Sequence, residues 1–287
     1  MIGSEPPLPV VRTVADLRQA LAAWRAQGLG VAFVPTMGAL HEGHLDLVRE
    51  AGRQADRTVA SVFVNPTQFA AHEDLGRYPR QEATDAALLA GAGCDLLYAP
   101  AVEEMYPPGA TTTIAVGGPA DGLEGEFRPQ MFGGVALVVA KLFNQVAPDV
   151  AVFGKKDWQQ LAVIRRMVRD LDLPVRLVGV PTARDGHGLA LSSRNAYLDE
   201  AQLETARRLN GVLADAADRA RAGRPLAGVE KDAHAALLKA GFDRIDYVAV
   251  RDAESLKPFA AGVVDGPARV LAAAWIGTTR LIDNLAV

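Results

Sequence analysis

The sequence predicts an α/β fold, in which a parallel sheet with helices on both faces precedes a smaller α+β domain. Up to Val180, short apolar runs alternate with segments of helical periodicity, and such alternation implies a parallel sheet. After Asn195 this pattern gives way to a helix-rich stretch and then to strand-like segments. With 287 residues, of which 49% are hydrophobic and 22% charged, the chain is long enough for two domains.

The first elements are a helix, a buried strand and a second helix. Apolar residues recur at spacings of three and four from Val14 to Trp24, so a helix is expected over 14–27. The continuous apolar run Val31–Val34 is typical of a strand covered on both faces, and we expect Pro35 to end it. The next helix should start near His44.

The alternation then continues to the end of the first domain. Strands are expected at 58–64, 94–100, 150–154 and 175–180, and helices at 82–92, 135–144 and 157–170. The second domain should have helices within 200–240 and paired strands at 245–250, 268–276 and 279–287. We place the boundary near 181–190, dividing the chain into domains 1–184 and 185–287, and interpret the Pro/Gly-rich segment 107–119 as a surface loop.

Composition limits the classes of partner and compartment. A formal net charge of -4 gives no basic excess for a nucleic-acid partner. Cys94 is the only cysteine, so neither an intrachain disulfide nor a thiolate metal cluster can form. The start MIGSEPPLPVV lacks the features of a signal peptide, and no apolar run approaches the roughly 18 residues of a membrane span. We therefore expect a cytoplasmic protein without a membrane partner.

Residues 35–51, PTMGALHEGHLDLVREA, directly follow the first strand and open a helix. Ligands bind beyond the carboxyl ends of parallel strands, where the strand order reverses. The N–H groups of a helix's first turn are unpaired and the helix dipole favours negative charge there, so the segment predicts a phosphate site. Gly38 and Gly43 allow the backbone to approach the phosphate closely, and His41 and His44 add side-chain donors.

Two other interpretations of this segment stay open. HEGH superficially resembles the zinc-protease motif, but its histidines are three apart instead of four and no third ligand is evident. The histidines could also cap the helix without binding a ligand. Hydride chemistry and a P-loop are disfavoured, because no GxxxxGKS/T occurs and Gly28-Leu29-Gly30 precedes its strand.

A second segment, SVFVNPTQF, brings Asn65, Thr67 and Gln68 to the end of the second strand. Amide side chains there can orient a small polar substrate. The alternative is a simple turn, initiated by Asn65-Pro66, with Gln68 in solvent.

Two later segments also suit phosphate chemistry. In FGKKDWQQL the strand ends at Gly154, so Lys156 can hold a phosphate and Asp157 a ribose hydroxyl or a magnesium-bound water. Alternatively Asp157 caps the helix and the lysines lie in solvent. In LSSRN, residues 191–195, two hydroxyls and Arg194 suit the charge of a pyrophosphate leaving group, although a plain turn would look the same.

Six segments carry, in this order, a resemblance to a known family: PTMGALHEGH, FVNPTQF, EDLGRYPR, FGKKDWQQLAVIRRMVRDL, GLALSSRN and RLIDN. The set resembles the pantothenate synthetases over nearly the whole chain. HxGH alone marks only the wider nucleotidyltransferase group, which includes class I aminoacyl-tRNA synthetases, whereas the ordered set is highly specific.

The resemblance implies a ligase with two half-reactions. Pantoate attacks the α-phosphorus of Mg-ATP and expels pyrophosphate, and the amine of β-alanine then attacks the pantoyl-adenylate and expels AMP. It implies a Rossmann-like domain that carries the site, a smaller C-terminal lid and a homodimer. Mg²⁺ accompanies ATP, no organic cofactor is tightly bound, and the partners are small molecules.

The resemblance also assigns site residues position by position. His44 is the family's proton donor and His41 a phosphate contact, and they form the catalytic group with Lys156 and Arg194. The ATP-binding set comprises Pro35, Thr36, Met37, Gly38, Ala39, Leu40, His41, Glu42, Gly43, His44, Gly154, Lys155, Lys156, Asp157, Ala183, Leu191, Ser192, Ser193 and Arg194. Pantoate and β-alanine are assigned to Gln68, Gln160, Asn65 and Met37. Because phosphoryl transfer depends mainly on positioning and charge stabilisation, we expect His44 to stabilise charge more than to donate a proton.

Several positions depart from the family's usual residues: Met131 replaces His, Gly133 Arg, Lys155 Glu and Trp158 Tyr or Phe, and His187 is unusual. Glu124 and Arg128 are retained. Lys155 adds positive charge where ATP is expected, so it can shift nucleotide affinity. Asp85 is considered as a magnesium contact.

Three other functions compete with the ligase. A nucleotidyltransferase that joins ATP to a phosphorylated cofactor precursor would use the same HxGH segment and release pyrophosphate but no AMP. A tRNA synthetase is disfavoured by the acidic balance, the missing KMSKS-type loop and the short chain. A nucleotide-binding regulatory module would explain the phosphate sites but not the accompanying Gln68 and Gln160.

Overall fold

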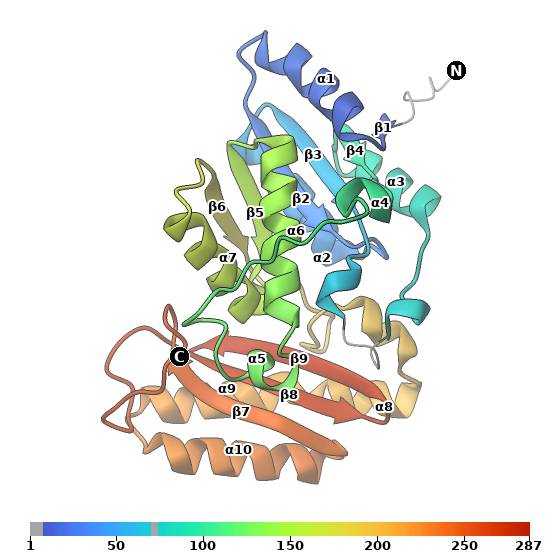
Figure 1. Ribbon diagram of the computed structural model, residues 1–287. Helices are drawn as coiled ribbons and strands as arrows, with labels where there is room; N and C mark the ends of the chain where they lie inside the picture. Colours follow the sequence, from blue (N-terminus) through green and yellow to red (C-terminus); the bar gives the residue numbers. More distant parts are fainter. Residues whose placement is uncertain (1–7, 70–73) are drawn as a thin grey trace. The chain divides into compact units, whose positions relative to one another are not determined.

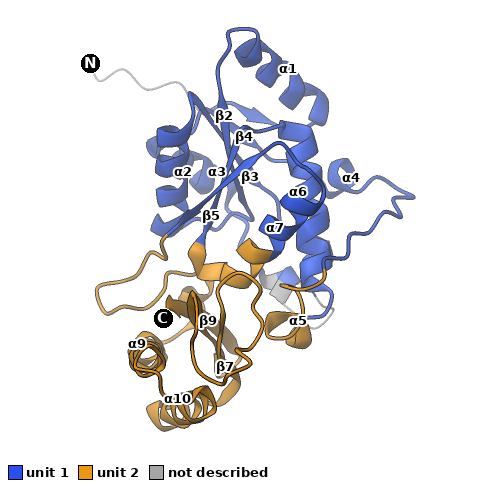
Figure 2. Cartoon of the chain, turned by 90° about the vertical axis from the view of Figure 1, so that its left-hand side faces the viewer, with its two compact units in different colours: residues 1–116, 128–154, 163–180 blue, residues 117–127, 155–162, 181–287 orange. Residues whose placement is uncertain are grey.

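The computed structural model describes residues 8–69 and 74–287 (Figure 1). The first residues of the start MIGSEPPLPVV and Glu73 of the EDLGRYPR segment lie outside the described residues. By contacts between residues, the chain divides into two compact units (Figure 2). Unit 1 comprises 1–116, 128–154 and 163–180, and unit 2 comprises 117–127, 155–162 and 181–287.

Unit 1 contains a parallel six-stranded sheet with the order β1-β4-β3-β2-β5-β6. Its strands are β1 (Val10–Val11), β2 (Val31–Thr36), β3 (Arg57–Val62), β4 (Leu96–Tyr98), β5 (Val150–Gly154) and β6 (Arg176–Val180). From β2 the chain proceeds to β3 and β4 on one side, whereas β5 and β6 lie on the other. The strand order therefore reverses between β2 and β5, the position at which a parallel sheet binds its ligand.

Helices cover both faces of this sheet, which confirms the predicted fold class (Figure 1). The main helices of the alternating part are α1 (Val14–Arg25), α2 (Glu42–Gln54), α3 (Glu82–Gly91), α6 (Met131–Val146) and α7 (Trp158–Asp170), and short helices occur at α4 (Val102–Met105) and α5 (Glu124–Phe127). Leu47, Val48 and Leu89 from α2 and α3 pack on the face formed by Ala32, Val34 and Val152. Neighbouring residues of a strand point to opposite faces, so the equally buried Phe33 belongs to the other face.

The elements expected from the sequence occur, with shifted ends. Strand β2 continues through Pro35 to Thr36, so the prediction that Pro35 ends it is wrong. Strand β5 pairs with β2 only at Ala32 and Phe33. Proline has no backbone N–H, but at Pro35 this removes no hydrogen bond to β5, because the pairing with β5 has already ended. Helix α2 begins at Glu42, two residues before His44, near which its start is predicted. Segment 107–119 has no helix or strand and is mostly exposed, as expected for a surface loop.

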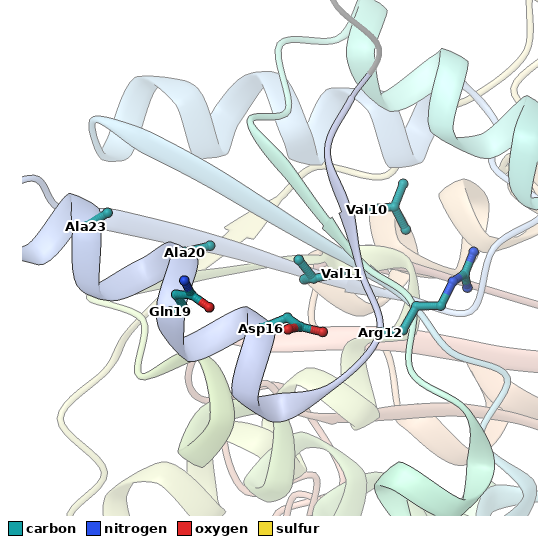
Figure 3. A pocket seen from close by; sticks show the side chains of 7 residues that line it. All are labelled: Val10, Val11, Arg12, Asp16, Gln19, Ala20 and Ala23. Carbon is teal, nitrogen blue, oxygen red and sulfur yellow. The ribbon is translucent and has the colours of Figure 1, made fainter.

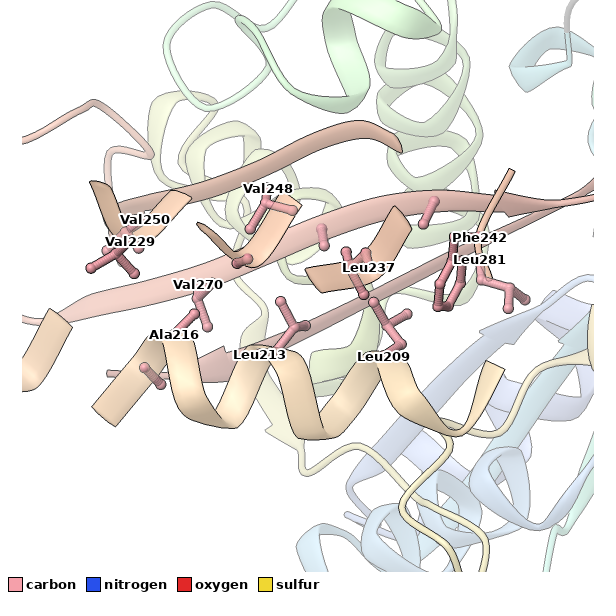
Figure 4. Packing of buried hydrophobic residues seen from close by; sticks show 14 of the residues in the cluster. Leu209, Leu213, Ala216, Val229, Leu237, Phe242, Val248, Val250, Val270 and Leu281 are labelled. Atoms are coloured by element: carbon pink, nitrogen blue, oxygen red, sulfur yellow. The ribbon is translucent and has the colours of Figure 1, made fainter. Parts of the chain in front are cut away.

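Unit 2 is built on an antiparallel sheet with the order β7-β8-β9. Its strands and helices are β7 (Arg244–Asp252), β8 (Ala268–Ile276), β9 (Thr279–Ala286), α8 (Glu200–Ala206), α9 (Arg208–Arg221) and α10 (Leu226–Ala240). In Figure 4, Leu209, Leu213 and Ala216 point from α9 toward the strands, where they join a cluster with Val250 and Val270. Leu271 lies on the opposite face of β8 in a second cluster, so both faces of the sheet are covered.

Both units are discontinuous in the sequence, so no single boundary separates them. Segments 117–127 and 155–162 belong with the C-terminal part, and unit 1 ends at Val180. The division passes through α7, whose first residues, Trp158–Ala162, lie in unit 2. Within the described residues no helix combines the length and the apolar character needed to cross a bilayer.

Candidate active site

The loop between β2 and α2 carries the first predicted phosphate site. Gly38 and Ala39 both adopt positive φ, at 81° and 51°. An added Cβ at Gly38 would lie 2.9 Å from Asp85 Oδ2 and 3.0 Å from Val62 Cγ1, so this turn requires glycine. The loop then enters α2 with His41 as N-cap and His44 in the first turn.

Asp85 on α3 holds this loop through its backbone. The carboxylate is 1% exposed and accepts the N–H of Ala39 at 3.0 Å and of Leu40 at 2.9 Å. Both oxygens are therefore bound to the protein, and this geometry makes Asp85 a residue that positions the loop. Since Gly38 N also donates to Thr36 Oγ1, fewer loop amides than the sequence suggests face outward for a phosphate.

The two histidines lie against each other at the start of α2. Their ring centroids are 4.1 Å apart, and the His41 N–H donates to His44 Nδ1 over 3.3 Å. Because Nδ1 of His44 accepts this bond, the neutral ring carries its proton on Nε2. Nε2–H is therefore the donor group of the His44 ring, and a donor of this kind suits a phosphate oxygen.

Asn65 is the centre of the second segment and is 1% exposed. Its Oδ1 accepts the Thr67 N–H at 3.3 Å and the Tyr106 hydroxyl at 2.8 Å. Its Nδ2 donates to the Gly134 carbonyl at 3.2 Å and to Gln68 Oε1 at 2.9 Å. The Thr67 N–H can only donate and the Gly134 carbonyl can only accept, so Oδ1 must face Thr67 and Nδ2 must face Gly134. The orientation of the Asn65 amide is thereby fixed.

This network also fixes the orientation of Gln68. Its Oε1 accepts from Asn65, so Nε2 is the group directed elsewhere, and it contacts Met37 Sδ at 3.2 Å. Gln68 therefore presents N–H donors, which can bind a carboxylate or hydroxyl oxygen of a substrate. Helix α6 supports the turn from behind, because its Gly134 lies directly against the backbone of Thr67 and Gln68.

The departures at 131 and 133 lie beside this turn. Arg128 donates to Met131 Sδ at 2.8 Å and to the Gln68 carbonyl at 3.4 Å. At Gly133 an added Cβ would lie 3.2 Å from the Ile114 carbonyl. Met131 therefore contacts the same guanidinium that reaches the Gln68 backbone.

In unit 2 the predicted nucleotide residues lie on two short segments. Lys155–Asp157 form a 3₁₀ turn directly after Gly154, the last residue of β5. Ser193–Tyr197 form another, in which Ser192 Oγ accepts the Arg194 N–H at 3.3 Å. The intervening Ala183 and Leu191 pair in a small hairpin, where the Leu191 N–H donates to the Ala183 carbonyl over 2.9 Å.

The adjacent glutamines of α7 differ in role. Gln159 is 3% exposed, accepts the Glu124 N–H at 3.0 Å and donates to the Pro119 and Gly122 carbonyls, both at 3.0 Å. Gln160 is half-buried, and no hydrogen bond of its side chain is recorded within 8–69 and 74–287. Gln159 thus holds segment 117–127, whereas Gln160 keeps its amide available for a substrate.

No group of three or more His, Cys, Asp or Glu side chains that could hold a metal ion occurs among the described residues. In nucleotide-dependent enzymes Mg²⁺ is usually bound by substrate phosphates, water and one or two carboxylates, so such a cluster is not required for it. A separate open pocket of about 710 Å³ lies between β1 and α1 and is lined by Val11, Asp16 and Gln19, among others (Figure 3). No predicted site residue lines it.

Comparison with known proteins identifies the family. The sequence model of the family described as Pantoate-beta-alanine ligase matches residues 9–286. The chain belongs to the pantoate–β-alanine ligase family. The pantothenate synthetase of Mesorhizobium japonicum is 58% identical over 278 residues, covering 97% of this chain and 97% of that protein. The predicted family and the ligase class are thereby confirmed.

Solved structures of the family share the whole fold. The pantothenate synthetase of Thermus thermophilus has a TM-score of 0.90 and 49% identity, covering 97% of this chain and 99% of that chain. The pantoate-beta-alanine ligase of Francisella tularensis, solved with beta-gamma ATP and beta-alanine, has a TM-score of 0.81 and 30% identity, covering 97% of both chains. Similarity of this extent places the chain's two-sheet architecture within the ligase family.

Unit 2 also contains a buried polar network that the sequence patterns did not predict. Arg280 donates to both oxygens of Glu124 at 2.7 Å and to Asp246 at 2.7 Å. Burial opposes the charge of Arg280, but these bonds outweigh it and raise its pKa above the ordinary value. The Tyr247 hydroxyl also donates to Glu124, and burial raises the pKa of Tyr247. The only sequence signal for this network was the motif RLIDN together with the retained Glu124.

Proposed function

We propose that the chain joins (R)-pantoate to β-alanine at the expense of ATP, giving pantothenate, AMP and pyrophosphate through a bound pantoyl-adenylate. The family match over 9–286 carries this proposal. The Francisella relative was solved with beta-gamma ATP and beta-alanine, and the proposal requires ATP and β-alanine besides pantoate.

In the first half-reaction, a pantoate carboxylate oxygen attacks the α-phosphorus and the bond to pyrophosphate breaks. The step requires alignment and compensation of negative charge, with little proton transfer. We assign compensation to His44, His41, Lys156 and Arg194. The Nε2–H of His44 supplies a donor at the start of α2, where the helix dipole also favours the phosphate.

Pantoate is held by amide donors under this proposal. Gln68 directs Nε2 away from Asn65, and Gln160 has an available amide. Met37 contacts Gln68 and limits the same space. Asn65 has used its hydrogen-bonding capacity within the protein, so it acts by orienting Gln68.

In the second half-reaction, the β-alanine amine attacks the adenylate carbonyl, AMP leaves with the bonding electrons and the amine loses a proton. Mg²⁺, when bound with ATP, neutralises phosphate charge. The remaining ATP contacts are the β2–α2 loop with Glu42 and Gly43, the turn Gly154–Asp157, the backbone of Ala183, and Leu191–Arg194. We further propose that 1–184 forms the catalytic domain and 185–287 a lid, that the enzyme is a homodimer and that it acts in the cytoplasm.

Product analysis tests the function. With ATP, Mg²⁺ and pantoate, pyrophosphate should exchange into ATP, and AMP and pantothenate should accumulate only after β-alanine is added. If pantoate supports neither exchange nor AMP formation while ATP still binds, the ligase proposal is wrong. Pyrophosphate release without AMP, from ATP and a phosphorylated precursor, would instead indicate a nucleotidyltransferase.

A further inference from the structure

The last strand, β9, carries three polar side chains of the RLIDN motif, and none has a role in the proposed chemistry. Each nevertheless binds a different segment of unit 2. Arg280 binds Glu124, Asp283 accepts two bonds from Arg184 at 2.7 and 2.9 Å, and Asn284 binds the turn at Lys155. Two of these segments are those to which we assign ATP.

Asn284 holds the first ATP segment through its backbone. The side chain is buried, at 2% exposure, and its Nδ2 donates to the carbonyls of Lys155 at 3.0 Å and Lys156 at 2.7 Å. Carbonyls only accept, so this orientation of the Asn284 amide is the one that satisfies both. Two successive peptide planes are thereby fixed, and with them the direction in which the Lys156 side chain leaves the turn.

A second layer holds Asn284 itself. Its Oδ1 accepts from Arg269 Nε at 2.7 Å. The Arg269 guanidinium lies 3.8 Å from the ring centroid of Trp158, whose Nε1 donates to the Ala253 carbonyl at 2.8 Å. Both N–H groups of the Asn284 amide and its oxygen are therefore hydrogen-bonded within the protein.

Asp283 holds the second ATP segment. It is 3% exposed, and its two-point bond with Arg184 fixes the hairpin in which Ala183 pairs with Leu191. Ser192–Arg194 follow that hairpin directly. Because neighbouring residues of a strand point to opposite faces, Asp283 and Asn284 can reach segments on the two sides of β9.

We propose that Asp283 and Asn284 are positioning residues that align the two ATP-binding segments of unit 2 without touching substrate. This inference rests on the proposed function for the identity of these segments. It explains why a motif near the chain's end, without reactive groups, accompanies the nucleotide motifs.

Direct binding of ATP tests the proposal. Asn284→Asp keeps the size and the acceptor for Arg269 but sets an oxygen against the Lys155 and Lys156 carbonyls. In calorimetry with ATP and Mg²⁺ but no pantoate, we expect the Kd for ATP to rise at least tenfold. Asp283→Asn, which weakens the hold on Arg184, should raise it about fivefold. In turnover assays the KM for pantoate should change less than threefold for both variants.

Leu213→Ala is the matched control for lost stability. Leu213 is fully buried in the cluster between α9 and the sheet, and among the described residues of this cluster none belongs to Gly154–Asp157 or to Leu191–Arg194. This variant should unfold at lower temperature, yet keep the wild-type Kd for ATP. An unchanged Kd in both β9 variants, or an equal rise in Leu213→Ala, would overturn the proposal, as would a wild type that binds no ATP. If the Kd shifts as expected but no pantothenate forms, the positioning stands and the proposed function fails.

Discussion

Replacement of Gly134 by alanine should disrupt the proposed pantoate-binding side of the site without altering any polar group. Gly134 lies in α6, and an added Cβ would be 2.4 Å from the Thr67 carbonyl oxygen and 2.7 Å from Gln68 N. Ordinary van der Waals contact begins at 3.4 Å, so the two backbones must separate by about 1 Å. Both partners are backbone, so no flexible side chain can move aside.

The expected magnitudes follow from this overlap. Overpacking of this kind costs about 1–3 kcal/mol, which lowers the unfolding temperature by roughly 2–4 °C per kcal/mol in a domain of this size. A shift of about 1 Å in a group that positions substrate can reduce the rate about 10²-fold. Since the turn carries Gln68 and Asn65, the loss should appear in kcat/KM for pantoate, and the KM for ATP should change little.

The matched control is Gly52→Ala in α2 of the same unit. Its Cβ would lie no closer than 3.8 Å to another residue, at Thr58 Oγ1, so the change should stabilise the helix by about 0.5–1 kcal/mol. Thermal unfolding and steady-state kinetics with varied pantoate or ATP measure both effects. Wild-type kcat/KM for pantoate in Gly134→Ala would refute the idea that this contact places Gln68.

Three further results are expected. Asn65→Asp replaces the donor to Gln68 Oε1 with an acceptor, so Gln68 should turn its carbonyl toward substrate. The KM for pantoate should then rise about tenfold, as expected for loss of about 1.4 kcal/mol of binding free energy. An unchanged KM would contradict this hydrogen-bond network. His44→Gln should keep most of the pantoate-dependent exchange activity, because it retains an N–H donor, whereas equal loss in Gln and Ala variants would show that His44 transfers a proton. Burial raises the pKa of the Cys94 thiol to about 11. The protonated Cys94 thiol therefore contributes fully to stability below its unfolded-state pKa of about 8.5, and this contribution is lost as pH rises through 11. The free energy of unfolding should fall over this pH interval. Cys94→Ala should flatten this slope, and native Cys94 should resist iodoacetamide at pH 8.

Most of the fold was predictable because buried positions recur along the sequence with the spacing of a helix or as the continuous apolar run of a buried strand. Val31–Val34 and Val150–Gly154 are continuous apolar runs, since a central parallel strand is covered on both faces. Strand β1 was not predicted, because two residues, Val10 and Val11, carry no periodicity. Nor could the sequence show that 117–127 and 155–162 belong with the C-terminal unit, since the bonds from Glu124 and Lys155 to β9 join residues far apart in the chain.

The placement of candidate site residues was predictable where reactive groups follow strand ends, as His41, His44 and Lys156 do. The supporting residues were not. A sequence does not show which groups a carboxylate binds, so Asp85 could be proposed as a magnesium contact. In the structure its carboxylate accepts hydrogen bonds from two backbone N–H groups of the loop. Gly134 lies within an apolar helix and looks like any other small residue there.

Polar residues that support the site differ from polar residues that are proposed to bind substrate in how many of their hydrogen-bonding groups have protein partners. Residue type alone does not separate these two groups. A side chain that binds substrate must keep donors or acceptors available, and it must reach the surface of a cavity. Asn65, Asp85 and Asn284 are buried with their amide or carboxylate groups occupied by protein partners, most of them backbone groups. Gln160 is half-buried, and Gln68 directs its Nε2 away from Asn65. Removal of a residue of the first group leaves buried backbone groups unsatisfied, at a cost of about 1–3 kcal/mol each, so it displaces a whole segment. Removal of a residue of the second group should leave the segment in place and lose only the proposed contact to substrate. Stability measurements made beside kinetics should therefore assign each polar residue to its group.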